Sequence, residues 1–214
     1  MNANLILMLY IVPMVVGFLF MTPIGATMTR SLTDRYSWMK HERRRHMFGL
    51  NLVVFVGFAI SVHTTWIGNK ISEGGSVCAS ASLFSCDDVI GNPLYNTDPL
   101  FGISWGMLGM LAFGALFFLT RTVGKELDAR WAESYLNIGF YLTSAGLLVI
   151  ALLVSYEIEM QKICQYCTTA HAANLVALFG FWKARQMHEH GTWNDRDGEA
   201  AATTSSKPAS GKVR

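Results

Sequence analysis

Four cysteines carry the chemistry that this sequence offers, and they form two pairs of different spacing. Seven residues separate Cys78 from Cys86, whereas Cys164 and Cys167 form a C-x-x-C motif. Thiol pairs carry electrons by exchange, in which a thiolate attacks a disulfide sulfur. Two pairs of different kinds therefore indicate an electron relay between two different partners.

The C-x-x-C motif opens an apolar stretch, which predicts a helix that begins near Cys164. Unpaired N–H groups at a helix N-terminus favour the thiolate form of a cysteine. Cys164, Cys167 (or Thr168) and His171 share one helical face, which continues to Asn174. Polar groups inside a membrane span mark a site by default. We therefore expect His171 to donate a hydrogen bond to a carbonyl-bearing ligand between the helices.

Less specific explanations of these residues stay open. The Cys78–Cys86 pair fits an ordinary disulfide that staples a loop, and two cysteine pairs can hold zinc, although we expect no metal. His171 and Asn174 fit plain interhelical hydrogen-bond partners. His63, near the outer end of an earlier apolar segment, fits either packing or the lining of a pocket.

Charge-free segments long enough to cross a bilayer separate these motifs. The chain is 51% hydrophobic and only 15% charged, against roughly a quarter charged in soluble domains. Crossing the hydrocarbon core takes about 20 residues, and only helices satisfy the backbone there. Asp, Glu, Lys and Arg are absent from 1–29, 47–69, 99–120, 134–156 and 163–182. The sequence therefore predicts an all-α membrane protein with five spans, the first too long for a signal peptide and lacking its basic start.

Basic residues predict the orientation of these spans. All but two of the 17 Lys and Arg residues fall in 30–46, in 121–133 or after residue 182, and the exceptions are Lys70 and Lys162. Because basic loops stay cytoplasmic, we expect an extracytoplasmic N-terminus and a cytoplasmic C-terminus. Both cysteine pairs then lie on the extracytoplasmic side, where disulfides persist. The net charge of +2 adds little. We interpret the basic segment 30–46 as a topology anchor at the lipid bilayer that can touch anionic lipid, and we expect no nucleic-acid partner.

The order of these motifs resembles that of a known family. The chain has a Cys-x7-Cys pair, then C-D-D-V-I and L-F-G-I-S, and finally I-C-x-Y-C-T-T-x-H at the start of the last apolar segment. This order resembles the vitamin K epoxide reductase family, in its bacterial and archaeal branch, over residues 47–185. In the other quinone-linked disulfide generator, DsbB, the C-x-x-C precedes the wide pair, which argues against that family.

The resemblance implies a role for each sulfur. Cys164 and Cys167 are implied to be the pair beside a quinone, with the Cys167 thiolate reacting with the ring. Cys86 is implied to exchange with Cys164, and Cys78 to meet the partner protein. His171 falls where the family places a Tyr or His that hydrogen-bonds the quinone.

Two positions depart from the family pattern. Trp105 occupies the position of a common Asn, in the stretch F-G-I-S-W-G, and Asn92 replaces a common Ser. The candidate quinone contacts are therefore His171, Trp105, Asn174 and His63.

The expected organisation is a four-helix core with additions at both ends. We expect an additional transmembrane helix in 1–29, a basic cytoplasmic loop in 30–46 and the catalytic core in 47–185, with its cysteine loop at about 70–98. A disordered cytoplasmic tail is expected in 186–214. No thioredoxin-like domain is expected after the core, so the partner should be a separate protein.

The expected function is that of a thiol-disulfide oxidoreductase in the inner membrane of a prokaryote. It would reoxidise a separate thioredoxin-fold, DsbA-like protein and pass the electrons to menaquinone or ubiquinone. One alternative is an enzyme that reduces a quinone or vitamin K epoxide for its own sake, with thiols only as electron donors. Another is a membrane scaffold whose two disulfides are static.

Overall fold

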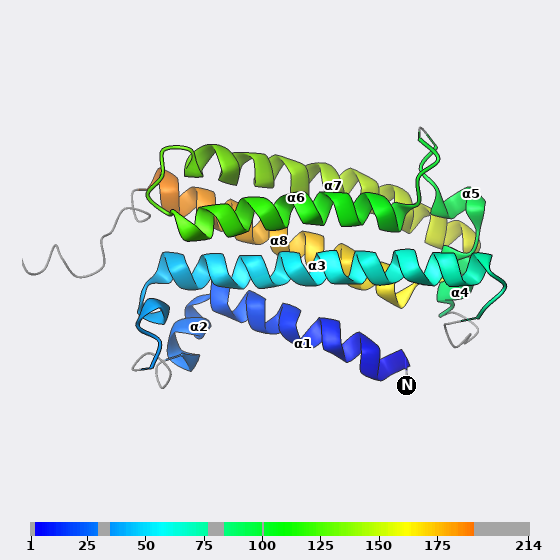
Figure 1. The fold of residues 1–214 in the computed structure, drawn as a ribbon, viewed down its shortest axis with the longest axis horizontal. Coiled ribbons are helices and arrows are strands. Elements are labelled where there is room, and N and C mark those ends of the chain that lie inside the picture. The colour runs from blue at the N-terminus through cyan, green and yellow to red at the C-terminus, as the bar shows by residue number, and fades with distance from the viewer. Residues whose placement is uncertain (1–2, 30–34, 77–83, 100, 191–214) are drawn as a thin grey trace, which may run out of the picture.

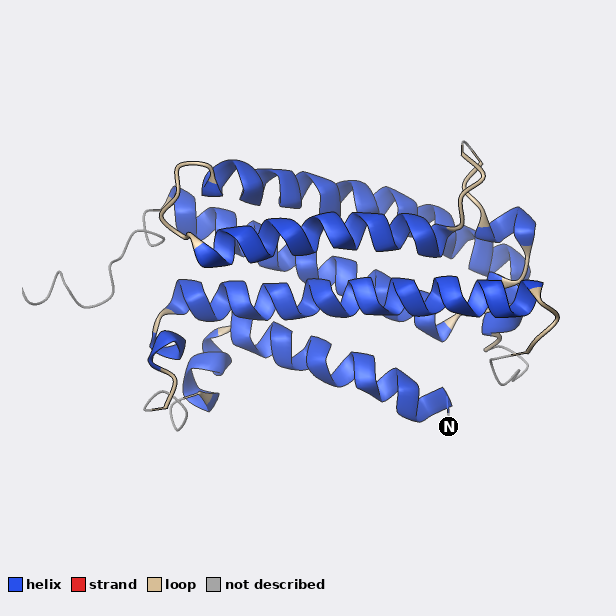
Figure 2. Cartoon of the chain, viewed as in Figure 1, coloured by secondary structure: helices blue, strands red, loops and turns tan. Residues whose placement is uncertain are grey.

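The computed structural model describes residues 3–29, 35–76, 84–99 and 101–190, which fold into helices joined by loops (Figures 1 and 2). The elements, in chain order, are α1 (Ala3–Met21), α2 (Pro23–Met28), the 3-10 helix η2 (Ser37–Lys40), α3 (Glu42–Ser72), α4 (Cys86–Ile90), α5 (Pro93–Asn96), α6 (Trp105–Lys125), α7 (Ala132–Met160) and α8 (Gln165–Glu189). The predicted all-helical class is thereby confirmed.

Four long helices, α3, α6, α7 and α8, run side by side as a bundle (Figure 1). α3 contacts α6, α8 and α1, and α7 contacts α6 and α8. α1 therefore lies on the outside of the bundle, against α3 and α8. The short helices α4 and α5 lie at one end, where α6 and α8 begin, and η2 lies at the other end, where α3 begins (Figure 1).

Three of the described helices, α3, α6 and α7, are long and apolar enough to cross a membrane. The apolar part of α1, Leu5–Met21, is shorter, because the predicted segment 1–29 is divided at Thr22, where Pro23 opens α2. α8 is long enough at 25 residues but carries polar side chains such as His171 and Asn174. The prediction of five spans therefore rests, for α1 and α8, on their place in the bundle.

Glycines bring the long helices into close contact. A β-carbon at Gly57 of α3 would overlap the ring of Phe113 of α6, and one at Gly139 of α7 would overlap the ring of Phe181 of α8. Small residues at helix crossings allow this close approach in membrane bundles. The two ring–glycine contacts fix how α6 packs on α3 and how α8 packs on α7.

Polar contacts join α1, α3 and α8 at the end where α3 begins. The Lys183 ammonium donates to the carbonyl of Met21 (2.7 Å) and pairs with Glu42 (3.3 Å). Nearby, Nε2 of the buried His46 donates to the carbonyl of Gly180 (2.8 Å). These contacts hold the N-terminal helix against the bundle.

Candidate redox site

A disulfide joins Cys164 and Cys167 at the start of α8, with the Cα atoms 5.2 Å apart. Gln161 ends α7 in the left-handed conformation (φ 52°), which turns the chain back toward the bundle. Cys164 is the N-cap of α8, and its Sγ accepts from the N–H of Cys167 at 3.2 Å. The N–H of Cys164 in turn donates to Glu157 Oε1 at 3.1 Å. The motif is therefore held from both helices that it joins.

Cys86 is held beside this disulfide by backbone pairing. Phe84 and Ile163 form a parallel β-bridge, in which the N–H of Ser85 donates to the carbonyl of Ile163 at 3.3 Å. Ser85 then caps α4, so Cys86 opens that helix. Cys86 is 5% exposed and belongs to the same buried cluster as Cys164, which is fully buried. The structure thus places Cys86 in the same buried cluster as the Cys164–Cys167 motif, whose Cys167 packs at the edge of that cluster.

Cys78, the remaining predicted relay cysteine, lies outside the described residues, so its pairing with Cys86 stays a prediction. The Ser76 hydroxyl donates to Asp87 of α4 at 2.6 Å. The described residues that flank segment 77–83 on either side therefore both lie near α4. Among the described residues, no group of three or more His, Cys, Asp and Glu side chains is placed to hold a metal ion.

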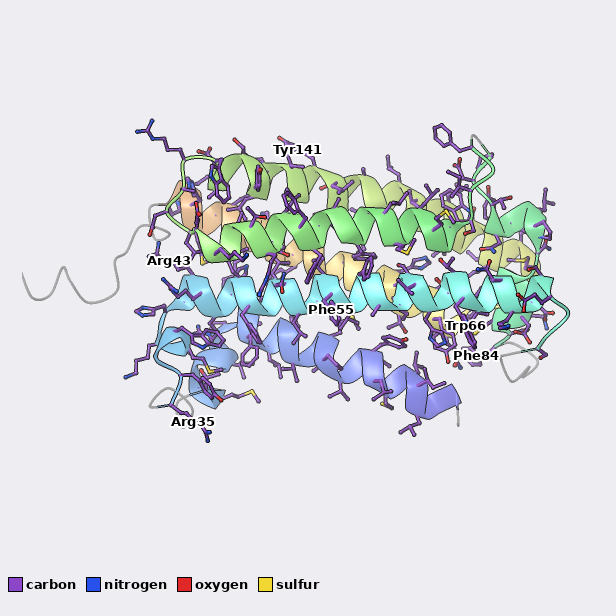
Figure 3. All side chains as sticks on the ribbon, in the orientation of Figure 1. Arg35, Arg43, Phe55, Trp66, Phe84 and Tyr141 are labelled. Carbon is purple, nitrogen blue, oxygen red and sulfur yellow. A yellow bond between two sulfur atoms is a disulfide. The ribbon has the colours of Figure 1, made fainter. Side chains whose placement is uncertain are left out.

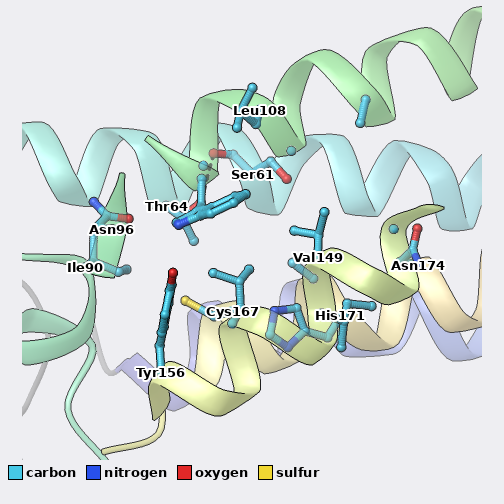
Figure 4. Close-up of a pocket in the computed structure, with 18 of the residues that line it drawn as sticks. Ser61, Thr64, Ile90, Asn96, Leu108, Val149, Tyr156, Cys167, His171 and Asn174 are labelled. Carbon is cyan, nitrogen blue, oxygen red and sulfur yellow. Dashed lines mark hydrogen bonds between the residues drawn. The ribbon is translucent and has the colours of Figure 1, made fainter. Parts of the chain in front are cut away.

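A cavity of about 390 Å³ lies on the other side of the disulfide, between α3, α6, α7 and α8 (Figure 4). Cys167, His171 and Asn174 line it from successive turns of α8, as the shared helical face predicts. Val149 of α7 and Leu108 of α6 are among its apolar walls. Binding cavities for small molecules span about 300–1,000 Å³ and are mostly apolar with a few placed polar groups. This cavity has both properties.

Trp105 is one of the polar residues that line this cavity. The residue lines the cavity in the first turn of α6, and its indole nitrogen is buried with no hydrogen-bond partner among the described residues. Asn174, by contrast, already donates from Nδ2 to the carbonyl of Thr143 at 3.0 Å. A quinone is a flat apolar ring with carbonyl acceptors, so the cavity and its unsatisfied N–H donor fit such a ligand.

His63 lies outside this cavity, on the α1 side of α3. Its Nδ1 is 3.0 Å from the hydroxyl of Tyr10. Its ring contacts the ring of Tyr166, one of the two residues between the cysteines of the motif, edge to face at 4.9 Å. His63 therefore packs behind the disulfide, while His171, Asn174 and Trp105 face the cavity.

The cavity is also lined by polar and aromatic residues that the sequence did not indicate, among them two from α7 and two from α5. Glu157 and Tyr156 come from the end of α7, and Tyr95 and Asn96 come from α5. Glu157 has a recognisable signal, because it is the first charged residue after the charge-free segment 134–156. Tyr95 and Asn96 have none, since they are brought in by a short helix in a loop.

A bundle of membrane-length helices that holds a C-x-x-C motif above an apolar cavity defines a membrane thiol oxidoreductase. Residues 50–182 match the family model described as the vitamin K epoxide reductase family. Since the match covers more than half of the chain, the protein belongs to this family. It is therefore a multi-pass membrane enzyme of thiol-disulfide and quinone chemistry. Comparisons with curated proteins and with solved structures found no match.

Proposed function

We propose that this enzyme reoxidises a thioredoxin-fold, DsbA-like protein outside the cytoplasm and passes the electrons through its two cysteine pairs to a membrane quinone. One observation carries the proposal. Cys164 is fully buried in the cluster that contains Cys86, whereas Cys167 packs at the edge of that cluster and also lines the apolar cavity. A pair arranged in this way accepts electrons on one side and releases them on the other.

The first step takes place at the outer pair. A thiolate of the reduced partner attacks the Cys78–Cys86 disulfide at Cys78, which forms a mixed disulfide and frees Cys86. The second thiol of the partner then resolves the mixed disulfide, so the partner leaves with its own disulfide. Two electrons now reside on the thiols of Cys78 and Cys86.

The second step is an exchange inside the protein. The Cys86 thiolate attacks Cys164, forms a Cys86–Cys164 disulfide and releases Cys167 as the thiolate. The β-bridge at Phe84 and the shared buried cluster support this choice of attacking and attacked sulfur. When Cys78 displaces Cys164, the outer disulfide is restored and both thiols of the inner pair are reduced.

The last step returns the inner pair to its disulfide. A bound quinone supplies an acceptor for two electrons and two protons, which balances the two thiols oxidised. Cys167 lines the cavity, and we take Trp105 and His171, which also line it, as the hydrogen-bond donors to the ring carbonyls. The apolar walls of the cavity exclude water from the thiolate.

The orientation proposed for the enzyme places this site on the extracytoplasmic side. Among the described residues, Lys70 and Lys162 are the basic residues at the cysteine-bearing end of the bundle, whereas the other described Lys and Arg residues lie toward the opposite end. A reducing cytoplasm would keep these thiols reduced, so the charge pattern and the cysteine chemistry favour the same orientation.

Substitution of single cysteines tests the relay. We expect Cys167→Ser to abolish reduction of menaquinone and of ubiquinone by the purified enzyme, because no thiolate then faces the cavity.

Cys86→Ala leaves Cys78 without its partner thiol, so a mixed disulfide between Cys78 and an oxidised thioredoxin-fold protein should accumulate. Quinone absorbance and mass spectrometry of the trapped complex are the measurements.

Cys78→Ser separates this function from reduction of a quinone or an epoxide for its own sake. The variant should still be reduced by dithiothreitol and should still reduce quinone, while oxidation of a DsbA-like partner is lost. Full oxidation of the partner by Cys78→Ser would refute the proposed order of sulfurs. Cysteine redox states that stay unchanged when quinone is removed would indicate a static scaffold instead.

A further inference from the structure

We propose that a second site, at the end of the bundle opposite the redox centre, binds the phosphate head group of an anionic phospholipid. A cavity of about 230 Å³ lies there between the start of α3 and the end of α6. We call it the basic groove. Its lining residues are Trp38, Arg44, Met47, Phe48, Asn51, Thr120, Arg121, Gly124 and Lys125.

A hydrogen bond between α3 and α6 forms the floor of the basic groove, and the mouth of the groove is open. Asn51 of α3 donates from Nδ2 to the hydroxyl of Thr120 of α6 at 2.9 Å, which closes the space between the two helices. Thr120 is 1% exposed. Arg44, Arg121 and Lys125 are exposed at the mouth, where their cationic groups reach a ligand that approaches from the membrane surface.

The charge of the basic groove is uncompensated. No Asp or Glu is among its lining residues. Among the described residues, Arg44, Arg121 and Lys125 form no ion pair, although other basic side chains at the same end do. Arg43, which neighbours Arg44, pairs with Asp128 at 2.5 Å. Topology alone explains basic residues at this end, but it does not explain three unpaired cations around one cavity.

Aromatic side chains continue the basic groove along the outside of the bundle. Arg44, Phe48, Asn51 and Phe55 follow one another at helical spacing on α3, so they lie in one row. Phe48 is 43% exposed and Phe55 is 49% exposed. Figure 3 shows Phe55 about midway along α3, away from the end marked by Arg43.

A matching row runs along α6. Lys125, Arg121 and Phe118 are spaced by four and three residues, and Phe118 is 61% exposed. Two rows that change from cationic at the rim to aromatic toward mid-membrane match a lipid, with its phosphate at the rim and its acyl chains below. Free phosphate would contact only the cationic rim. A phospholipid is the occupant that accounts for both the cationic rim and the aromatic rows.

The test uses the purified full-length protein in detergent. Short-chain phosphatidylglycerol, short-chain phosphatidylcholine and inorganic phosphate are titrated separately, and retained ligand is counted by native mass spectrometry. We expect phosphatidylglycerol to bind and the other two to bind far more weakly. The double variant Arg121→Gln/Lys125→Gln should bind phosphatidylglycerol at least about tenfold more weakly, since each cation near an anionic lipid contributes roughly fivefold.

Arg130→Gln is the matched control, because Arg130 is an exposed cation at the same end that does not line the basic groove. It should leave binding unchanged. Equal weakening by Arg130→Gln would overturn the proposal in favour of unspecific charge, and equal binding of phosphatidylcholine or of inorganic phosphate would also overturn it. Arg44→Gln, a single change at an exposed position, serves if the double variant does not fold.

Discussion

The buried indole N–H of Trp105 stands in the site with no acceptor among the described residues. An unsatisfied donor of this kind costs about 1–3 kcal/mol. We propose that a ligand carbonyl accepts from this N–H, which would remove the cost. The donor comes from a longer and flatter side chain than the Asn that it replaces.

Trp105→Phe should therefore weaken quinone binding and not the chemistry that follows. Loss of one hydrogen bond of about 1 kcal/mol corresponds to roughly a fivefold rise in KM for quinone, with kcat nearly unchanged. Trp182→Phe, the same change at a position of α8 that does not line the cavity, should leave both constants unchanged. A kcat loss in Trp105→Phe with an unchanged KM would contradict this role.

Asp88, in the short helix beside the redox cluster, gives the site a pH-sensitive contact. A hydrogen bond with Ser85, followed by the Lys162 ammonium 3.4 Å away, lowers the pKa of the Asp88 carboxyl below its usual value. Because the folded pKa is the lower one, the contribution of Asp88 to stability is complete above the unfolded pKa. It is lost as the pH falls through the folded pKa.

Titration of the Asp88 carboxyl carbon by NMR tests the two causes. The midpoint should lie below the ordinary Asp value of about 3.9. Ser85→Ala should raise it more than Lys162→Met, because the hydrogen bond with Ser85 is the larger cause and the ion pair is exposed to solvent. A larger effect of Lys162→Met would show that the ion pair dominates.

At the scale of the elements, α8 packs closely against its neighbour α7. Gly139 leaves space for the ring of Phe181, which is 1% exposed. Since α8 carries the C-x-x-C motif, the depth at which this ring sits also sets where the cysteines lie relative to α7. Packing in the middle of the bundle thus helps to position the two cysteines at its end.

Gly139→Ala should destabilise the bundle by about 1–3 kcal/mol, the usual cost of an added methyl group in a full core. Gly124→Ala is the matched control, because a β-carbon at Gly124 of α6 meets nothing within 4 Å. It should change stability by less than about 0.5 kcal/mol. Thermal unfolding in detergent measures both, and equal midpoints for the two variants would contradict the packing argument.

Sequence patterns predicted the long helices well and the short ones poorly. Absence of charge over about 20 residues marks a span, so α3, α6 and α7 lie where 47–69, 99–120 and 134–156 predicted them. The helices α4 and α5 carry no such periodic signal. Their place is set by tertiary contacts, such as the bridge to Ile163.

For the site, helical spacing on α8 was enough to align Cys167, His171 and Asn174 along one cavity. It did not tell which face of α3 meets that cavity, so the sequence allowed His63 either packing or a place in the pocket, and in the structure it packs against α1. Only the packing of α1 on α3 decides this, and no local pattern in the sequence encodes it.

At the scale of the whole molecule, the bundle has two different ends, joined by membrane-length helices (Figure 1). We call the end where α8 begins with its cysteines the thiol end, and the end where α3 begins the basic end. The proposed orientation makes an accessibility prediction for each end. A cysteine introduced at Asn69, which is exposed at the thiol end, should react with an impermeant maleimide in intact cells.

A cysteine introduced at Ser205, in the C-terminal stretch, should react with the same maleimide only after lysis. The unmodified protein, labelled in parallel, supplies the background from its own thiols. Labelling of the Ser205 variant and not of the Asn69 variant in intact cells would reverse the orientation.

The β-bridge between Phe84 and Ile163 bears on the rate of the proposed thiol exchange. It ties two segments that are far apart in the chain, so the proposed attack of Cys86 on Cys164 would take place between groups already held near each other. Reactions between groups held in this way proceed as though the attacking group were present at a very high effective concentration. The internal exchange should then run at a rate independent of enzyme dilution and outpace attack by free small thiols at millimolar levels. Electrons that enter the outer cysteine pair would therefore pass to the inner pair before a free thiol in the surroundings can react with the outer pair.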